Sequence, residues 1–444
     1  MVVEAWLPRA ASAHPRRTAI ETPEARLTYS ELHDAARGAA ATLAEQGIGA
    51  GHWVALGLPP GVQFAVALHA CLLLGAVSVP VDPRLTPEER ELVTARARLV
   101  VSQPLEATGR SGAALLETHD LAAAAIVVHT SGTSARPRPI ELTYGNWLWS
   151  ALGAALALGL DPEERWLCAL PLAHVGGLSI LVRSVIYGTT AVIHERFEAE
   201  RVLAELVDPA GSTLVSLVAT TLARLLEAGL ERPPRLRCAL VGGMALPSEL
   251  SRRARAAGVP VRHTYGLTEA CSQVTAQPVG EDEAAGEAQT TDDAGTPLFC
   301  TQVKIADDGE ILVRGPTVAP RSVAADGWLH TGDRGLVQDG RLRVSGRKSN
   351  AIVTGGENVA PEEVEAVLAA HPAVAEALVT GRTHPEWGEA VVASVVLRPG
   401  REVGPSELRR YCGEHLAAFK VPKEISLSAQ PLPRNRTGKL VRSG

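Results

Sequence analysis

The sequence lacks any close pair of cysteines. Its 444 residues contain six cysteines, which are scattered along the chain. None has the short spacing typical of zinc or redox motifs. We therefore expect buried, unreactive thiols in a reducing compartment. The six are Cys71, Cys168, Cys238, Cys271, Cys300 and Cys412.

An excess of positive charge is also missing, and no secretory leader is expected. The chain has 43 Lys and Arg against 49 Asp and Glu, for a net charge of -6 at pH 7. This balance argues against a nucleic-acid partner or an anionic membrane surface. The start, MVVEAWLPRAASAHPRR, does not have the charged-then-apolar order of a signal peptide.

One apolar run, residues 64–81, has the length of a membrane span. His69, Gly75 and Pro80 interrupt it, and VSVPVDP is typical of a strand that enters a turn. The prediction is a buried helix followed by a buried strand, with no membrane span. A cytoplasmic location follows as an expectation.

Up to about residue 300, apolar runs of strand length alternate with helical patterns. Residues 124–129 and 235–243 are typical strand runs, and residues 29–47 carry the apolar rhythm of a helix. This alternation predicts an α/β fold with mostly parallel sheets covered by helices on both faces. Further on, residues 303–315 and 335–346 each place Asp-Gly between two strand runs, which predicts two hairpins.

A small α+β unit is expected at the end of the chain. Residues 360–372, APEEVEAVLAAHP, have a proline and two glutamates near the start and another proline at the end, which marks both ends of a helix. The polar, glycine-bearing stretch 345–358 is expected to be a linker. The domain boundary is therefore predicted near residues 346–350.

Four loops rich in glycine and hydroxyl groups follow strand runs. They are HTSGTS, PLAHVGG, VGGM and YGLTE, which begin at residues 129, 171, 241 and 265. Ligands of parallel sheets bind beyond the carboxyl ends of the strands. Each loop could be an ordinary turn, but four together favour one shared site.

The loop HTSGTSARPRP offers hydroxyls, backbone N–H groups and two arginines, Arg136 and Arg138, to phosphoryl oxygens. The usual glycine-rich phosphate-loop pattern with its Lys-Ser/Thr pair is absent. A solvated turn is the alternative interpretation.

In YGLTE, Tyr265 could stack on a base and Glu269 could hold Mg²⁺ through an oxygen ligand. A helix cap formed by Thr268 or Glu269 is the alternative. Asp333, in GWLHTGDRG, could bind both hydroxyls of a ribose, or it could belong to an ordinary turn. Lys439 lies in the basic stretch PLPRNRTGKLVR, for which a solvated tail is the alternative.

Five motifs together resemble the adenylate-forming superfamily of acyl- and aryl-CoA synthetases, amino-acid adenylation domains and luciferases. They are HTSGTS, YGLTE, GWLHTGD, GRKSNAIVTGGENVAPEEVE and PRNRTGK, and the resemblance extends from about Thr18 to Arg442. It implies that a carboxylate attacks the α-phosphate of ATP, giving an acyl-adenylate and pyrophosphate, and that a thiol then displaces AMP. ATP and CoA as co-substrates, Mg²⁺ and a homodimer are expected on the same ground.

The resemblance also implies an organisation into domains. Residues 1–346 would form an N-terminal ATP- and acyl-binding domain with a β-rich subdomain at about 295–346. Residues 347–350, with Ser349, would be a hinge, and residues 351–444 a small mobile domain that rotates between the two half-reactions.

Roles for single residues follow from the same motifs. Lys439 would stabilise charge at the α-phosphate, Glu269 would hold Mg²⁺, and His174 would be a catalytic gate. The residues that would bind ATP are Thr130, Ser131, Gly132, Thr133, Gly243, Met244, Tyr265, Gly266, Thr268, Asp333 and Arg347. The residues that would complete the thiol channel are Gly355, Gly356, Glu357 and Asn358.

The segment LPLAHVGGLSILVRSVIYG is the most discriminating for the acid. It resembles the corresponding segment of the o-succinylbenzoate–CoA ligases of menaquinone biosynthesis, with a cation nine residues after the histidine. His174 and Arg183, with Gly242 and Gly243, would contact the acid, and Arg183 could pair with a second carboxylate. The alternative is a generic aryl- or medium-chain acyl-CoA synthetase, in which Arg183 caps its helix or snorkels from it.

The sequence departs from the family pattern in two places. Ser134-Ala135-Arg136-Pro137-Arg138-Pro139 replaces a loop that usually has two glycines, and Pro139 lacks a donor N–H. Asn350 replaces a usual Asp beside the hinge. The altered loop alone supports a catalytically silent nucleotide-binding homologue, against which Lys439 and Glu269 argue. An amino-acid adenylation domain is disfavoured because no acidic residue accompanies VGG.

Overall fold

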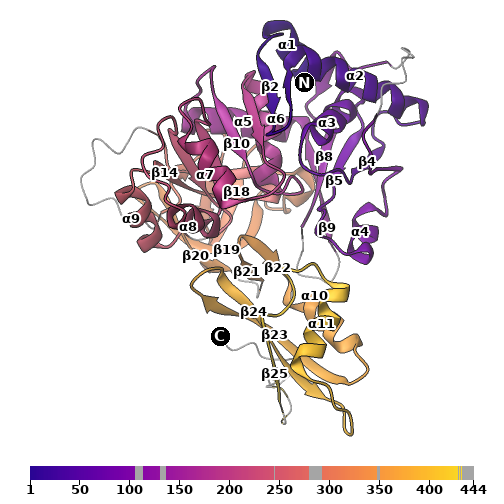
Figure 1. The fold of residues 1–444 in the computed structure, drawn as a ribbon, viewed down its shortest axis with the longest axis vertical. Helices are drawn as coiled ribbons and strands as arrows, with labels where there is room; N and C mark the ends of the chain where they lie inside the picture. The colour runs from indigo at the N-terminus through magenta and orange to yellow at the C-terminus, as the bar shows by residue number, and fades with distance from the viewer. Residues whose placement is uncertain are drawn as a thin grey trace. The chain divides into compact units, whose positions relative to one another are not determined.

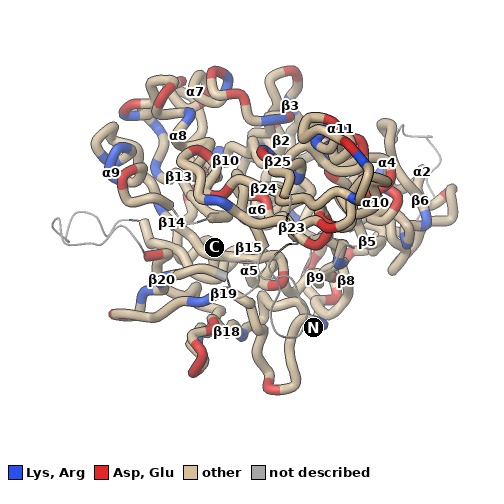
Figure 2. The backbone as a smooth tube through the Cα atoms, turned by 90° about the horizontal axis from the view of Figure 1, so that it is seen from below, with Lys and Arg blue, Asp and Glu red and all other residues tan. Residues whose placement is uncertain are grey.

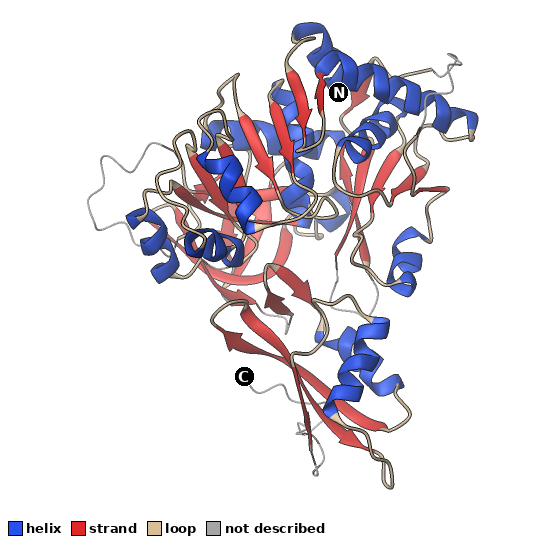
Figure 3. Ribbon diagram, in the orientation of Figure 1, coloured by secondary structure: helices blue, strands red, loops and turns tan. Residues whose placement is uncertain are grey.

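The computed structural model describes residues 1–105, 114–130, 137–244, 246–279, 293–347, 351–428, 430 and 432. Its strands form five sheets (Figure 1, Figure 3). The chain divides into two compact units. The first comprises Met1–Pro83, Arg96–Val128 and Ile140–Gly346, and the second comprises Arg84–Ala95, His129–Pro139 and Arg347–Gly444.

A nine-stranded sheet in the first unit has the order β16-β15-β14-β13-β12-β10-β11-β2-β3. Its central neighbours, from β14 through β2, pair in parallel, whereas the outer pairs are antiparallel. The strands are β2 (Thr18–Glu21), β3 (Arg26–Thr28), β10 (Arg165–Cys168), β11 (Thr190–Ile193), β12 (Leu214–Leu217), β13 (Cys238–Val241), β14 (Val261–Leu267), β15 (Ser272–Ala276) and β16 (Thr296–Pro297).

Both faces of this sheet are buried, as the sequence predicts. Successive residues of β13 alternate between two hydrophobic cores, with Cys238 and Leu240 in one and Ala239 and Val241 in the other. A strand points successive side chains to opposite faces, so helices must cover both. The helices of this region are α5 (Tyr144–Leu158), α6 (Val175–Tyr187), α7 (Ala199–Val207), α8 (Ala219–Glu227) and α9 (Ser248–Ala256).

A five-stranded sheet of order β6-β4-β5-β8-β9 accompanies the N-terminal helices. Its elements are α1 (Trp6–Ala13), α2 (Tyr29–Glu45), β4 (Trp53–Leu56), α3 (Val62–Leu74), β5 (Val77–Pro80), β6 (Leu99–Val101), β8 (Ala124–Thr130) and β9 (Arg138–Thr143). A separate antiparallel pair is made by β1 (Val2–Glu4) and β7 (Thr118–Asp120).

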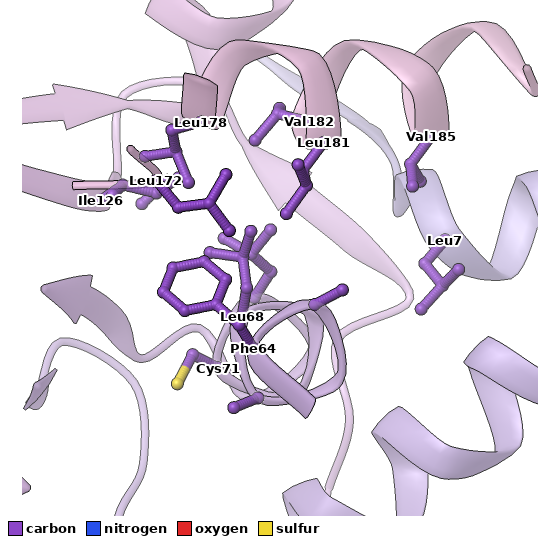
Figure 4. Close-up of a cluster of buried hydrophobic side chains, with 14 of the residues drawn as sticks. Leu7, Phe64, Leu68, Cys71, Ile126, Leu172, Leu178, Leu181, Val182 and Val185 are labelled. Atoms are coloured by element: carbon purple, nitrogen blue, oxygen red, sulfur yellow. The ribbon is translucent and has the colours of Figure 1, made fainter. Parts of the chain in front are cut away.

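The long apolar run is a buried helix followed by a buried strand, as predicted. Phe64 and Leu68 of α3 lie beside Leu178 and Leu181 of α6 in the core (Figure 4). Gly75 ends α3 in the left-handed conformation, with φ +68°, which a residue with a side chain rarely adopts. No helix within the described ranges has the length and apolarity needed to cross a bilayer.

All six cysteines are free, and five of them are buried, whereas Cys300 is half-buried. Burial raises the pKa of the Cys71, Cys168 and Cys238 thiols to about 12. These thiols are therefore protonated and unreactive at neutral pH, in agreement with the expectation.

Both predicted hairpins are present in an antiparallel sheet of order β17-β18-β19-β20. Its core contains Ile311, Val313, Leu329 and Leu342, which are nearly inaccessible to solvent. The strands are β17 (Gln302–Ile305), β18 (Glu310–Arg314), β19 (Leu329–Gln338) and β20 (Arg341–Arg347).

The second unit contains a sheet of order β22-β21-β24-β23, in which β25 also pairs with β24. The predicted linker is wrong over residues 352–358, because β21 and β22 form a hairpin there. Gly355 and Gly356, both with positive φ, supply the tight turn that joins them. The elements are α4 (Pro87–Thr94), β21 (Ile352–Thr354), β22 (Glu357–Val359), α10 (Pro361–Ala370), β23 (Val374–His384), β24 (Gly388–Leu397), α11 (Pro405–His415) and β25 (Glu424–Leu427).

The start of α6 supplies a matched test of packing. A Cβ added to Gly177 would lie 2.7 Å from Pro171 O and 2.9 Å from Leu170 O, whereas one added to Gly176 would meet only the Leu170 side chain at 3.5 Å. We expect Gly177→Ala to lower the free energy of unfolding by about 1–3 kcal/mol, because backbone must move. Gly176→Ala should leave it unchanged or raise it by up to about 1 kcal/mol. Urea denaturation checks both, and equal effects of the two substitutions would contradict this account.

Candidate active site

Three of the four predicted loops lie at one edge of the nine-stranded sheet. PLAHVGG follows β10, VGGM begins at the last residue of β13, and YGLTE lies at the end of β14. These strands run in the same direction, so their carboxyl ends share an edge. Of the fourth loop, Thr130 ends β8 in the other sheet. Ser131, Gly132 and Thr133 lie outside the described residues.

The backbone around YGLTE is unusual. Thr268 and Glu269 form a short 3-10 turn that has no side-chain cap, so the helix-cap alternative is wrong. A Cβ on Gly266 would lie 1.9 Å from Ser272 O, so only glycine permits this approach of β14 to β15. Cys271 and Ser272 follow with φ of 54° and 91°. Left-handed backbone at residues with side chains costs free energy and is concentrated at functional sites.

Tyr265 and Asp333 are brought together by different elements. The Tyr265 hydroxyl, at the end of β14, donates a hydrogen bond of 2.7 Å to Asp333 Oδ2 on β19. Asp333 is 4% exposed and belongs to a strand, so the interpretation as an ordinary turn is wrong. The two residues assigned by resemblance to adenine and ribose are therefore neighbours.

A network of charged side chains surrounds Gly332, the residue before Asp333. Glu310 accepts a hydrogen bond of 2.9 Å from the Gly332 N–H, and its other oxygen lies 3.1 Å from His330 Nδ1. His330 Nε2 lies 3.0 Å from Asp326 Oδ2. Glu310 is a residue that the sequence prediction missed. Its signal is weak, because it occupies one position of an ordinary hairpin strand.

His174 lies immediately before α6 and faces a carboxylate. Its Nε2 is 3.7 Å from Oδ2 of Asp82, which is almost fully buried. Asp82 follows the buried strand β5 and was not predicted. The Asp82 carboxylate is therefore an acidic neighbour of the His174 ring.

Arg183 is buried within α6, with a relative exposure of 1%. Its guanidinium donates hydrogen bonds to Gln273 Oε1 at 2.7 Å and to Ser150 Oγ at 2.8 Å. Both proposed alternatives, a helix cap and a snorkelling side chain, are therefore wrong. Burial lowers the pKa of Arg183, because its charge has lost water.

Contacts connect Arg183 to the VGGM loop. Gln273 Nε2 donates to Thr264 Oγ1 at 3.4 Å. A Cβ on Gly242 would lie 2.9 Å from Thr264 Cγ2. Gly243 has φ of +78°, and Met244 follows it. Gln273 thus links Arg183 to the residue beside Gly242, and sequence reasoning missed both Gln273 and Ser150.

The remaining predicted residues belong to the second unit or lie outside the residues that the structure describes. Gly355 and Gly356 form the β21–β22 turn, and Glu357 and Asn358 begin β22. Arg347 ends β20. Ser349, Asn350 and Lys439 lie outside the described residues, as do Ser134, Ala135 and Arg136 of the altered loop.

Pro139 has a structural place that the sequence did not predict. It is the second residue of β9, which is an edge strand of its sheet. An edge strand tolerates proline because one side of its ladder has no partner. The missing N–H of Pro139 therefore falls in a strand and not in the phosphate loop.

The donor set fits a magnesium ion that is held mainly by phosphate. No cluster of three or more His, Cys, Asp or Glu side chains suitable for a metal occurs among the described residues. Mg²⁺ in nucleotide sites is typically bound by one or two carboxylates together with substrate phosphates and water. The half-buried carboxylate of Glu269 is suited to this arrangement.

Comparisons with known proteins place this architecture in a class. The model of the AMP-binding enzyme family matches residues 7–121 and 101–321, and that of the AMP-binding enzyme C-terminal domain matches residues 363–439. The chain belongs to the AMP-binding enzyme family.

Within that class, the chain is similar to one group of ligases over its whole length. It is 37% identical over 478 residues to the 2-succinylbenzoate–CoA ligase of Bacillus subtilis (strain 168), covering 99% of this chain and 96% of the relative. A double mutant of o-succinylbenzoate CoA synthetase from Bacillus subtilis, bound with the product analogue OSB-NCoA, has TM-score 0.92 and 35% identity, covering 100% of this chain and 98% of that chain. The same synthetase in complex with ATP and magnesium ion has TM-score 0.72 and 34% identity, covering 99% and 98%.

The network around His330 predicts a measurable titration. Hydrogen bonds to Asp326 and then to Glu310 raise the pKa of His330 above the usual 6.5. The protonated ring therefore stabilises the fold fully below pH 6.5, and this contribution is lost as the pH rises through the raised pKa. We expect the NMR titration midpoint of His330 to lie above 6.5 and to fall in Asp326→Asn. The same midpoint in both proteins would refute the assignment.

Proposed function

We propose that the protein joins 2-succinylbenzoate to CoA in two steps, through an acyl-adenylate formed with ATP. The full-length similarity to 2-succinylbenzoate–CoA ligases supports the reaction. The observation that carries the choice of acid is Arg183, a buried guanidinium whose hydrogen-bond acceptors are both neutral.

The first step needs charge neutralisation at the α-phosphate. A carboxylate oxygen is a poor leaving group, whereas AMP leaves readily from an adenylate. Tyr265 and Asp333 would hold the adenosine, and Lys439 would stabilise the transition state as a point charge. Mg²⁺, held by Glu269, would offset the charge of the phosphates.

The second carboxylate of the substrate would form an ion pair with Arg183. Among the described residues Arg183 forms no ion pair, and its Nε is buried without a hydrogen-bond partner. A buried charge is costly unless it is paired. A dicarboxylate could exchange with the Gln273 or Ser150 contact and supply that pair, whereas a monocarboxylate that is itself being activated could not.

Three further expectations remain predictions. The domain limits at residues 346 and 351 and the hinge at Ser349 rest on the resemblance. The association of two copies rests on it as well.

A substrate panel tests the reaction. With ATP, Mg²⁺ and CoA, we expect thioester formation from 2-succinylbenzoate to exceed that from benzoate and medium-chain fatty acids. Lys439→Ala should still bind ATP and release pyrophosphate at least about a hundredfold more slowly. A preference for fatty acids would favour a generic acyl-CoA synthetase. ATP binding without pyrophosphate release by the unaltered protein would favour the silent homologue.

The role of Arg183 is tested by Arg183→Met, which keeps the buried volume and removes the charge. We expect KM for 2-succinylbenzoate to rise at least about tenfold, the scale of a lost charge-assisted hydrogen bond. The matched control is the monocarboxylate that keeps the carboxyl group being activated and lacks the other one, and its KM should change by less than about threefold. An equal rise for both acids would contradict the pairing, and thermal unfolding reports whether the variant is folded.

A further inference from the structure

A buried lysine in the second unit connects two segments that are more than three hundred residues apart. Lys420 Nζ donates hydrogen bonds to Glu89 Oε1 at 2.6 Å and to Glu363 Oε1 at 2.7 Å. Lys420, Glu89 and Glu363 are 5%, 5% and 8% exposed. The three charges come from α4, α10 and the segment after α11, and these helices lie side by side (Figure 1, Figure 2).

All side-chain nitrogen and oxygen atoms of Lys420, Glu89 and Glu363 except one form hydrogen bonds. The other oxygen of Glu89 accepts from the Ala417 N–H at 3.1 Å and from the Thr86 N–H at 2.9 Å, which caps α4. Glu363 Oε2 is buried and accepts no hydrogen bond within the described part of the chain. Burial opposes the charge of Lys420, but the two carboxylates prevail and raise its pKa.

The same segment also contacts the glycine turn that the resemblance assigns to the thiol channel. Arg84 Nη2 donates a hydrogen bond of 2.7 Å to Glu357 Oε1, directly after Gly355 and Gly356. The Arg84 guanidinium lies 5.0 Å from the centre of the Phe419 ring, the neighbour of Lys420. Residues 84–95 therefore hold β22 through one charge pair and the Lys420 segment through another.

One interpretation of these contacts is that they only stabilise the fold. Buried ion pairs are weak contributors to stability compared with apolar packing of the same volume. Buried ion pairs can instead favour a single conformation, because a partner that moves away leaves the other charge buried and unpaired. The glycine turn has positive φ at both positions, and the Gly355 N–H donates a hydrogen bond of 2.9 Å to Trp387 O.

We propose that Arg84, Glu89 and Lys420 are positioning residues for thioester formation, which hold the Gly355–Asn358 turn against residues 84–95. The inference rests on the proposed ligase function and adds residues that the family motifs do not include. None of the three would touch the reacting atoms.

Separate measurement of the two steps tests the inference. Adenylation is followed by pyrophosphate release without CoA, and transfer by single-turnover reaction of the enzyme-bound adenylate with CoA. The acid is the one that the unaltered protein activates fastest. We expect Glu89→Gln and Arg84→Gln to slow transfer at least about tenfold, because a misplaced turn costs rate. Pyrophosphate release should change by less than about twofold.

Glu424→Gln is the matched control, because Glu424 pairs with Arg382 in the same unit but on an exposed surface. It should leave both steps unchanged. Variants that slow both steps equally, or neither, would overturn the proposal. Arg84 is 39% exposed, so Arg84→Gln decides the question if Glu89→Gln fails to fold. Failure of the proposed function would be seen instead as an unaltered protein that releases no pyrophosphate with 2-succinylbenzoate.

Discussion

Parallel pairing of β10, β12, β13 and β14 is the constraint on which the candidate site depends. Because these strands run in one direction, the loops that follow them meet at one edge of the sheet. The strands are short and buried on both faces, so the sheet itself offers no room for variation. The polar residues of the site consequently lie in the loops, at the end of β14 and on neighbouring elements, such as Arg183 on α6, Gln273 on β15 and Asp333 on β19.

The first unit was largely predictable from the sequence, because its strands and helices have clear apolar periods. The runs at residues 124–129 and 235–243 and the helix over 29–47 needed only the periodicity of their buried faces. The β21–β22 hairpin was missed because its strands are three residues long and its polar residues resemble a linker. The Gly355–Gly356 pair does indicate a turn, but the short, polar segments on either side of it do not indicate strands.

The candidate site also contains some residues that the sequence predicts and others that it does not. Residues within motifs, such as Tyr265 and Asp333, could be named from the sequence, but their hydrogen bond joins two sheets and required the fold. Ser150, Gln273 and Asp82 could not be named, because none of them belongs to a recognisable motif. Their meaning comes only from a partner far away in sequence, namely Arg183 for the first two and His174 for the third.

Two buried cations, Lys420 and Arg183, carry the same charge in different surroundings. Lys420 is enclosed by two carboxylates, so its charge is satisfied within the protein and serves to fix an arrangement. Among the residues that the structure describes, the hydrogen-bond acceptors of Arg183 are neutral, so its charge is solvated by hydrogen bonds but not neutralised there. A guanidinium in that condition attracts an anion more strongly than one already paired, because no protein carboxylate must be displaced. The contrast supports the proposal that Arg183, and not Lys420, selects a substrate by its second carboxylate.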